Sequence, residues 1–241
     1  MASDRAAFRL RDQFDSEVIR YASGFKLDGS GDNVARTLAG DVNGTKQDSN
    51  AGNDELLAAN KLDRTDFLAT GAAGDSIPLD PEGGSAVSPL ALLNRMSRIL
   101  DQANVEKEGR FFVADPVFYE LLMDENSKLI NNDYAGGQDA GDILRNGRVV
   151  NGSIRGFQVF VSNNVVQVGT GAGTAGSAAQ SANYGVALAG HMSSIATAQQ
   201  LAKTEQYRDP NSFADIVRGM QLYGRKVLRS ESLLTARYNV A

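Results

Sequence analysis

The sequence contains no cysteine, no tryptophan and a single histidine, His191. Disulfides, iron–sulfur clusters and catalytic thiolates all need cysteine sulfur, so these classes of site are excluded. Zinc fingers and centres with several histidine ligands are excluded as well. At 241 residues the chain is long enough to fold around a hydrophobic core without a covalent staple, as one large domain or two small ones.

Long apolar segments are also missing. No stretch reaches the roughly 18 consecutive apolar residues that cross a membrane. The first residues, 1–5, contain no apolar core of a signal peptide. The net charge is −5, with 22% charged residues, so a broad cationic surface for a phosphate backbone is not expected.

Two segments carry the apolar period of an amphipathic helix. Residues 3–22 form the first, with Ser3 as N-cap, Gly24 beyond its end and the stripe Ala7, Leu10, Phe14, Val18 and Tyr21. Residues 88–104 form the second, which begins with Ser88-Pro89. Its apolar stripe consists of Leu92, Leu93, Met96, Ile99, Leu100 and Ala103.

Shorter elements fill the rest of the sequence. A capped helix is expected from Asp115-Pro116 to Leu122, and further short helices at 33–39, 54–68 and 193–200. Strands are expected at 110–114, 148–150, 153–155, 157–161, 186–189, 201–207, 213–223, 227–228 and 233–238, with Asn151-Gly152 as a hairpin turn. The order lacks a regular alternation of strand and helix, so we predict an α+β fold.

Glycine is abundant, with 25 residues, and concentrates in polar loops. Loops dominate 24–87, 131–147 and 169–182. So much length without regular structure is unusual inside one domain. It indicates either loops that a neighbouring molecule orders or a surface that makes contacts. The low-complexity segment 169–182 can bury little apolar area, so we expect it to tolerate shortening.

Several motifs match a functional pattern only in part. Gly171, Gly173 and Gly176 have the spacing of a dinucleotide-binding loop but lack the following helix and acidic residue. Two runs of acidic and amide residues begin like calcium loops but lack the required glycine and closing glutamate: Asp28, Ser30 and Asp32, then Asp48, Asn50 and Asp54. Asn43-Gly-Thr45 and Asn151-Gly-Ser153 match the glycosylation sequon and are interpreted as turns.

No residue is assigned a catalytic, cofactor-binding or metal-binding role. His191 has no recognisable nucleophile motif near it, and Asp124-Glu125 is interpreted as a solvated pair at a helix end. The last 24 residues are mildly basic, with Arg218, Arg225, Lys226, Arg229 and Arg237 in or near them. We interpret these cations as strand-edge charges or as ion-pair partners across a subunit contact, with a nucleic-acid patch as the alternative.

Residues 88–164 resemble the central part of the major capsid proteins of tailed bacteriophages. The resemblance rests on the order and spacing of several segments: SPLALLNRMSRILDQ, RFFVADPVFYELLMD, Leu-Ile-Asn-Asn at 129–132 and NGRVVNGSIRGFQVFVSNNV. The closing segment FADIVRGMQLYGRKVLRSESLLTARY also resembles the family's last strand pair. The first helix, with Phe14-Asp15 and Val18-Ile19, resembles its spine helix. Together these segments cover about two-thirds of the chain.

The resemblance implies the Hong-Kong-97-type coat fold. Residues 1–86 would form a peripheral domain with the spine helix and Gly-rich loops, 87–200 the axial domain, and 201–241 the return strands of the peripheral domain. Family members carry an N-terminal arm and an extended β-hairpin loop before the spine helix. Because the helical pattern begins at about residue 3, we expect both to be absent from this chain. No crosslinking residue is carried over from the family.

The function implied is structural rather than enzymatic. The chain would be a self-assembling protomer of an icosahedral bacteriophage capsid that encloses double-stranded DNA. Its partners would be further copies of itself in pentamers and hexamers, together with scaffold, portal and decoration proteins. The packaged DNA would be contacted without sequence specificity, and no membrane or cofactor is expected. The protein would assemble in the host cytoplasm and reside in the virion.

Three other readings of the sequence stay open. An encapsulin-like compartment shell would share the fold and differ in holding cargo. A secreted or surface binding module would use the Gly-rich loops for recognition. An enzyme would have to rely on His191 or on the Gly171 segment.

Overall fold

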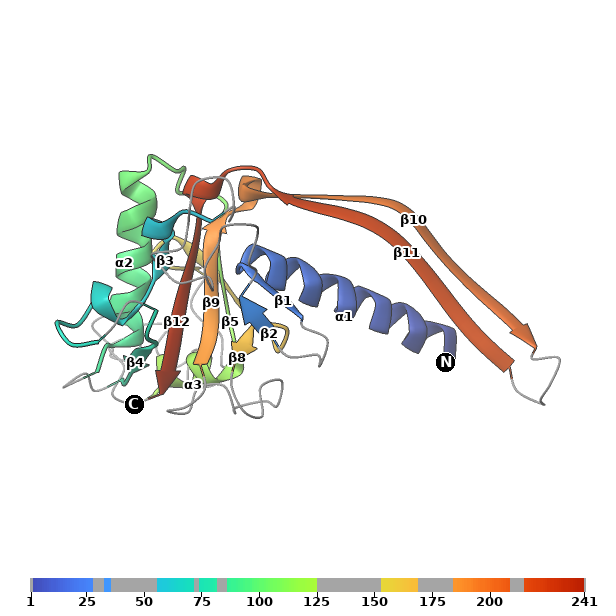
Figure 1. The fold of residues 1–241 in the computed structure, drawn as a ribbon, viewed down its shortest axis with the longest axis horizontal. Coiled ribbons are helices and arrows are strands. Elements are labelled where there is room, and N and C mark those ends of the chain that lie inside the picture. The colour runs from blue at the N-terminus through green and yellow to red at the C-terminus, as the bar shows by residue number, and fades with distance from the viewer. Residues whose placement is uncertain are drawn as a thin grey trace, which may run out of the picture.

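A computed structural model of the chain describes residues 2–27, 33–35, 56–71, 74–81, 86–124, 153–168, 184–208 and 215–240. Two parts are distinct: a body built on a mixed sheet, and an arm in which a long helix and a long hairpin lie side by side (Figure 1). Strands and helices are mixed without βαβ repetition, so the predicted α+β class is confirmed.

The body is an eight-stranded sheet. Its main path runs in the order β3 (Lys61–Leu62), β12 (Leu233–Val240), β9 (Tyr184–His191), β5 (Arg110–Ala114), β7 (Phe157–Val161) and β6 (Ser153–Ile154). Two further strands pair with its centre: β4 (Ile77–Leu79) runs parallel to β12, and β8 (Gln167–Val168) runs antiparallel to β9. Strands from the middle and from the end of the chain therefore share one sheet.

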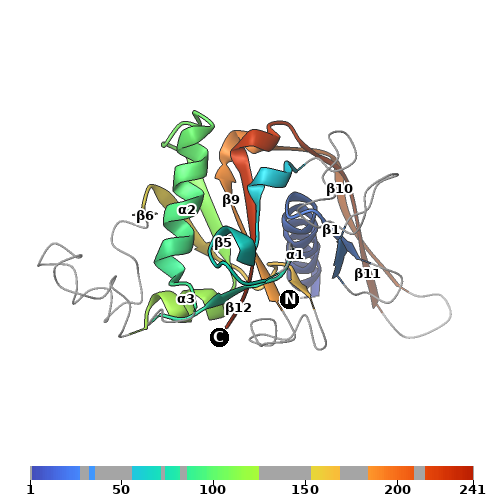
Figure 2. The ribbon, with the colours of Figure 1, turned by 60° about the vertical axis from the view of Figure 1, so that its left-hand side comes forward.

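One face of this sheet is covered by two helices, α2 (Pro89–Gln102) and α3 (Pro116–Leu122), as Figure 2 shows. The main hydrophobic core lies between them and the sheet, with fully buried residues from both layers: Leu92, Leu93, Met96, Phe112, Phe118, Ala187, Ala189, Leu234 and Tyr238. Pro89 begins α2 at the predicted place. Asp115 caps α3 by accepting a hydrogen bond of 2.8 Å from the Phe118 amide.

The opposite face of the sheet packs on the C-terminal end of α1 (Ala2–Ala22). Leu188 alternates along β9 with Ala187 and Ala189 and joins Ala22 and Leu56 in a second core cluster. This period of two is the pattern of a strand that is buried on both faces. A third cluster brings Phe25 onto Val166 and Val186. Phe25 lies in β1 (Phe25–Leu27), which pairs with β2 (Asn33–Ala35).

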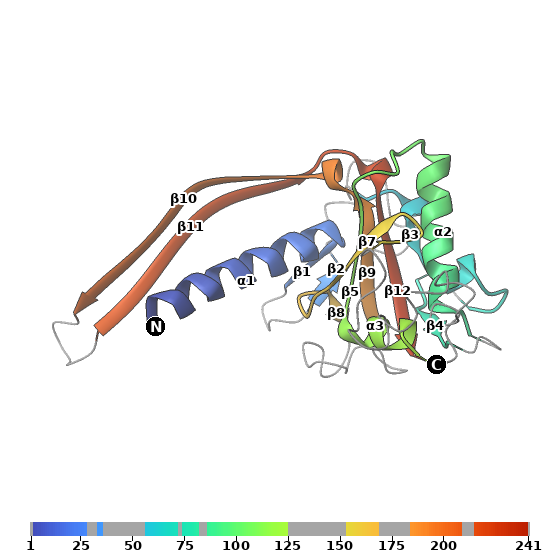
Figure 3. The ribbon, with the colours of Figure 1, turned by 180° about the vertical axis from the view of Figure 1, so that it is seen from behind.

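The arm consists of α1 and the two-stranded hairpin of β10 (Ile195–Arg208) and β11 (Asp215–Val227). The hairpin leaves the sheet after β9 and returns into β12, and it runs alongside α1 in Figures 1 and 3. The pairing is antiparallel along its whole length, with a bulge between Gln199 and Leu201. Residue 200, where the sequence places a domain border, lies inside β10.

Most of the predicted elements are confirmed. These are the helices at 3–22, 88–104 and 116–122, the strands at 110–114, 157–161, 186–189, 201–207 and 233–238, and the described part, 215–223, of the strand expected at 213–223. The predicted N-cap Ser3 is wrong, because α1 already begins at Ala2. Gly24 has a φ of 81°, as the residue after a helix end requires. The described turn before β7 is Arg155-Gly156, with both φ positive, and the predicted turn at Asn151-Gly152 lies outside the described residues.

Three predicted helices are wrong. Residues 33–35 form β2, because they pair with β1. The segment 56–68 contains two single 3₁₀ turns, Ala58–Asn60 (η1) and Arg64–Asp66 (η2), separated by β3, which pairs with β12. Residues 195–200 belong to β10, because pairing with β11 outweighs the local helix preference of alanine and glutamine. Within the described ranges, no helix is long and apolar enough to cross a membrane.

Candidate functional site

The hairpin meets the body at a junction that we call the elbow. It consists of two 3₁₀ turns, η4 (Met192–Ser194) and η5 (Ser230–Ser232), together with Asn60. Ser194 and Ser232 are buried and their hydroxyl oxygens lie 2.8 Å apart. The Ser194 carbonyl also accepts from the Leu228 amide at 2.8 Å. These contacts hold the two ends of the hairpin together where they enter the sheet.

Asn60 fixes the elbow to the edge of the sheet. Its side-chain amide nitrogen donates to the carbonyl oxygens of Ser230 at 2.9 Å and Leu233 at 3.0 Å. Asn60 is only 5% exposed, so water cannot readily replace these hydrogen bonds. A residue that lies about 170 positions earlier in the chain therefore satisfies the backbone of η5.

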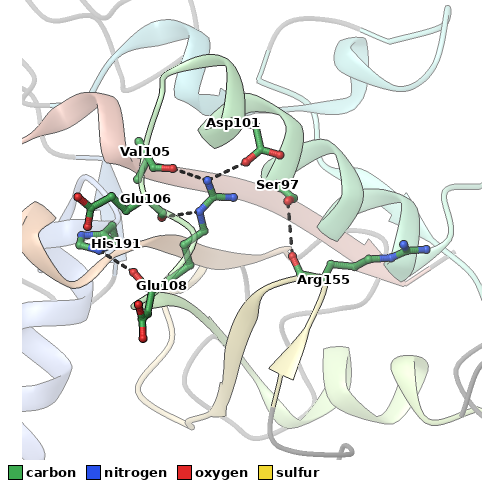
Figure 4. Close-up of polar contacts among 8 residues, drawn as sticks. Ser97, Asp101, Val105, Glu106, Glu108, Arg155 and His191 are labelled. Carbon is green, nitrogen blue, oxygen red and sulfur yellow. Dashed lines mark hydrogen bonds and ion pairs between the residues drawn. The ribbon is translucent and has the colours of Figure 1, made fainter. Parts of the chain in front are cut away.

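His191 lies at the elbow as the cap of η4. Its Nε2 atom is 2.9 Å from the Glu108 carbonyl, which can only accept, so Nε2 carries the proton. Nδ1 then accepts from the Ser193 amide at 3.2 Å and from the Ser193 hydroxyl at 2.8 Å. Figure 4 shows His191 beside Glu108. Both ring nitrogens thus serve local structure, as expected for a structural histidine.

The loop from α2 into β5 is organised by a buried arginine, Arg110, which is 1% exposed. Its guanidinium donates to Asp101 at 2.8 Å and to the carbonyl oxygens of Val105 and Glu106 at 2.6 and 2.9 Å. Figure 4 shows Asp101 at the end of α2, and Val105 and Glu106 on the connection that follows the helix. Asp101 is 43% exposed, so the buried cation is paired with an acid at the surface.

Helix α1 is joined to the hairpin through Glu17. Arg225 donates to its carboxylate at 2.6 Å, and the Tyr223 hydroxyl donates to the same oxygen. Partial burial raises the pKa of Glu17, but the hydrogen bonds from Tyr223, Arg225 and Gln13 outweigh it and leave the pKa below its ordinary value. Phe14 packs edge-on against Tyr223, with ring centroids 4.8 Å apart.

A second set of hydrogen bonds joins α1 to the body. Arg20 donates from Nε to the Asn33 side chain at 2.8 Å, and Asn33 donates to the Gln167 carbonyl at 2.9 Å. Asn164 donates to the Asp12 carboxylate at 2.8 Å. These contacts place the helix relative to the strands β2 and β8. Periodicity in the sequence predicts the helix but gives no signal for these cross-links.

A small cleft lies at the junction of α1 with β3 and β12. Its lining includes Ser23, Lys61, Asp63, Thr235 and Arg237, and it has room for about one water molecule. His191 is not part of it. Among the residues that the structure describes, no three His, Asp or Glu side chains gather closely enough to hold a metal ion.

The basic residues near the C-terminus do not share one surface. Arg225 faces α1, Arg218 pairs with Glu205 on the hairpin at 2.7 Å, and Arg237 donates to the Gly74 carbonyl in the body at 3.2 Å. The Gly171 segment, both calcium-like runs, the sequon at Asn43 and the residues Asn151 and Glu125 lie outside the described residues. No assignment of those motifs is tested.

Comparison with known proteins gives matches in structure only. No family model and no curated protein sequence matches the chain. A chain of Mycobacterium phage Che8 matches with a TM-score of 0.62 and 20% identity, covering 98% of this chain and 61% of that one. A chain of the capsid of cyanophage P-SCSP1u matches with a TM-score of 0.53 and 17% identity, covering 100% and 65%.

A chain of the mature capsid of bacteriophage PhiM1 matches as well, with a TM-score of 0.56 and 16% identity, covering 97% of this chain and 63% of that one. The present chain spans less than two-thirds of the length of each of these three chains. At such identities the likeness concerns the fold. The protein shares its fold with chains of bacteriophage capsids.

Proposed function

We propose that the protein is a self-assembling structural subunit of an icosahedral bacteriophage capsid that encloses double-stranded DNA. The observation that supports this most is the extent of the structural likeness. Body and arm together, nearly the whole chain, match chains from two phage capsids. The resemblance of residues 88–164 to tailed-phage capsid proteins points the same way from the sequence.

The division into body and arm suits a shell subunit. A closed shell needs contacts in which different surfaces of identical copies meet, and an elongated arm provides surfaces far from the body. Each such contact can be weak, because every copy makes several of them. The spine helix of the proposed Hong-Kong-97-type fold corresponds to α1.

We assign the peripheral domain to the arm and the axial domain to the sheet with α2 and α3. This assignment moves the border that the sequence placed at residue 200 to the elbow, near Ser194. It also gives β12 to the sheet, with which it pairs. Helix α1 and the hairpin then belong to one unit although the chain visits the body between them.

The proposed partners follow from a capsid role. Copies of the chain would form pentamers and hexamers, with scaffold, portal and decoration proteins acting during and after assembly. A net charge of −5 is compatible with enclosing DNA without holding it tightly. Assembly would take place in the host cytoplasm, and the product would be part of the virion.

The test is microscopy of the purified protein, supported by light scattering. Closed shells of uniform diameter are the expected result. Monomers and small oligomers at every concentration would overturn the proposal. Empty shells that form without any nucleic acid would still support it, because the DNA is cargo.

A further inference from the structure

The two faces of the hairpin are chemically different. Positions with odd numbers in β11 face α1: a Cβ on Gly219 would contact Leu10, while Tyr223 and Arg225 contact Phe14, Glu17 and Tyr21. Positions with even numbers point away from α1, because side chains alternate along a strand. The hairpin therefore has an inner face, which the helix covers, and an outer face.

The outer face combines apolar and charged residues. Met220 and Leu222 are 57% and 52% exposed, and Tyr207 on β10 is 42% exposed. The register places Lys203 opposite Met220, and Glu205 opposite Arg218. We define the outer hairpin face by these six residues: Lys203, Glu205, Tyr207, Arg218, Met220 and Leu222.

The charged residues on this face are already ordered. Glu205 accepts from Arg218 at 2.7 Å and pairs with Lys203 at 2.5 Å. The Arg218 guanidinium also lies over the Tyr207 ring, 5.1 Å from its centroid. One carboxylate thus holds two cations, and a positive excess stays on the face. Because the side chains are fixed before binding, a partner would lose less entropy in ordering them.

Exposing the apolar side chains of this face to water is unfavourable. A two-stranded hairpin is at best marginally stable alone, and α1 covers one of its sides only. Met, Tyr and Arg are the residue types that protein interfaces favour, and Lys and Glu are more common on free surfaces. Lys203 and Glu205 are of the second kind, whereas Met220, Tyr207 and Arg218 are of the first, and these three favour a protein partner over a free surface.

Charge indicates which protein fits. The hairpin, residues 195–227, has five basic and three acidic residues, whereas the whole chain has a net charge of −5. The rest of the chain therefore carries −7. Three exposed carboxylates lie together in sequence at the end of α2 and on the connection after it: Asp101, which pairs with Arg110, and then Glu106 and Glu108. They outnumber the one exposed cation of that connection, Lys107, so a second copy offers carboxylates to the cations of the hairpin.

We propose that the outer hairpin face is the surface with which one copy of this chain binds the body of a second copy. The contact joins two different surfaces, so it can continue from copy to copy and close into rings or a shell. Met220, Leu222 and Tyr207 are its buried centre, and Lys203 and Arg218 meet the acidic body of the neighbour. This inference rests on the proposed function and specifies one of its contacts.

The test compares two exposed apolar residues, one on the outer face and one in the body. Met220 is 57% exposed on the outer face, and Val161, the last residue of β7, is 47% exposed. Met220→Asp and Val161→Asp are compared with the unaltered chain by sedimentation over a range of protein and salt concentrations. Met220→Asp is expected to raise the concentration needed for self-association by at least about ten-fold, and Val161→Asp to leave it unchanged.

A second variant guards against a folding defect. Lys203→Glu reverses one charge of the outer face at a side chain that is 62% exposed. It is expected to weaken self-association and to reduce its dependence on salt, with an unchanged melting temperature. If Met220→Asp has a lower melting temperature than the unaltered protein, the self-association of Lys203→Glu decides whether the outer hairpin face is the contact.

Each outcome separates the inference from the proposed function. Shells that form as readily with Met220→Asp and Lys203→Glu as without them overturn the inference alone. Small oligomers that these variants abolish, with no shells from the unaltered protein, support the inference and overturn the capsid function. A chain that never self-associates overturns both. Variants that lose binding to duplex DNA while self-association is unchanged assign the face to nucleic acid instead.

Discussion

The body and the arm are stabilised in different ways. In the body, α2 and the sheet bury a continuous apolar core, with Leu93, Met96 and Phe112 inaccessible to water. Among the side chains that the structure describes in β10 and β11, only that of Val227, next to the elbow, is buried. Ion pairs, ring contacts and capped turns hold the arm in place. Apolar burial therefore stabilises the body, whereas polar contacts and packing against α1 hold the hairpin of the arm.

This difference predicts which property of the protein a substitution should change in each region. Changes in the body should alter whether the chain folds, because apolar burial dominates stability there. Changes in the arm should alter how its parts are placed while the body stays folded. A substitution in the core of the body that leaves folding intact would contradict this difference between the two regions. A substitution in the arm that unfolds the whole chain would contradict it as well.

The largest effect is expected from a charge in the core. Phe112 is inaccessible to water and packs on Phe118 and Phe157, with ring centroids 5.1 and 6.4 Å away. Phe112→Asp would bury an unpaired carboxylate or force it to stay protonated, which costs several kcal/mol, comparable to the whole stability of a domain. Leu93→Asp is expected to act in the same way. Soluble protein that melts cooperatively would contradict both core assignments.

The next effect concerns a buried hydroxyl, Tyr238, which donates to Asp115 from a site closed to solvent. A Cβ on Gly185 would come within 2.8 Å of its ring, so a glycine is needed beside it. Burial, and then the charge of Asp115, raises the pKa of Tyr238 well above its ordinary value of 10.0. Tyr238→Phe is expected to lower the free energy of unfolding by about 2 kcal/mol at neutral pH.

The pH dependence of this site follows from the direction of the shift. In the unfolded chain the phenol loses its proton near pH 10.0, whereas the folded protein retains it. The stabilisation is therefore complete below pH 10.0 and is lost as the pH rises through the higher pKa of the folded state. Urea titrations between pH 8 and 11 measure the free energy of unfolding, which should decline less steeply with pH in Tyr238→Phe than in the unaltered protein. The same decline in both proteins would contradict the assignment of this pH dependence to Tyr238.

A smaller effect is expected at the elbow, between the two regions. Asn60→Ala leaves the carbonyl oxygens of Ser230 and Leu233 without their donor. A loss of about 1–2 kcal/mol is expected, because these acceptors lie in a partly dry site. Limited proteolysis should also cut the hairpin faster than the body. Equal protection of the two regions would show that other contacts hold the elbow.

The smallest effect is expected within the arm. Glu17→Gln removes the charge that pairs with Arg225, and both side chains are less than one-third exposed. A loss of about 0.5–1 kcal/mol is expected for such a partly exposed pair. Because the folded pKa of Glu17 is below its ordinary 4.5, its stabilisation is present above pH 4.5 and is lost as the pH falls through the lowered value. Hydrogen exchange of α1 at pH 3 and pH 7 measures it, with Asp15→Asn, at an exposed acid of the same helix, as the control.

The sequence was sufficient for the elements with strong periodicity or clear caps. Residues 3–22 and 88–104 have apolar stripes, and Asp115-Pro116 carries a cap and a proline at the first helical position. The sequence predicts a helix at 193–200 because alanine and glutamine favour a helix locally, whereas pairing with β11 makes residues 195–200 part of β10. Pairing partners more than twenty residues away give no local signal.

The candidate site was less accessible to prediction than the fold. Composition excludes cysteine-based and multi-histidine sites, but the elbow depends on contacts between Asn60, Ser194 and Ser232, which are far apart in sequence. The outer hairpin face could have been recognised only with the register known. Once Gly219, Tyr223 and Arg225 are placed on the helix side, the exposure of Met220 and Leu222 follows from strand alternation.

The geometry of the elbow has a mechanical consequence. At about 3.3 Å per residue, the 13 residues of β11 span roughly 40 Å. Any change in angle at Ser194 and Ser232 is therefore amplified along the hairpin. A rotation of about 5° there would displace the far end by roughly 3–4 Å. In the proposed shell, such a rotation would let copies of the chain meet neighbours at slightly different angles while their sheets stay identical.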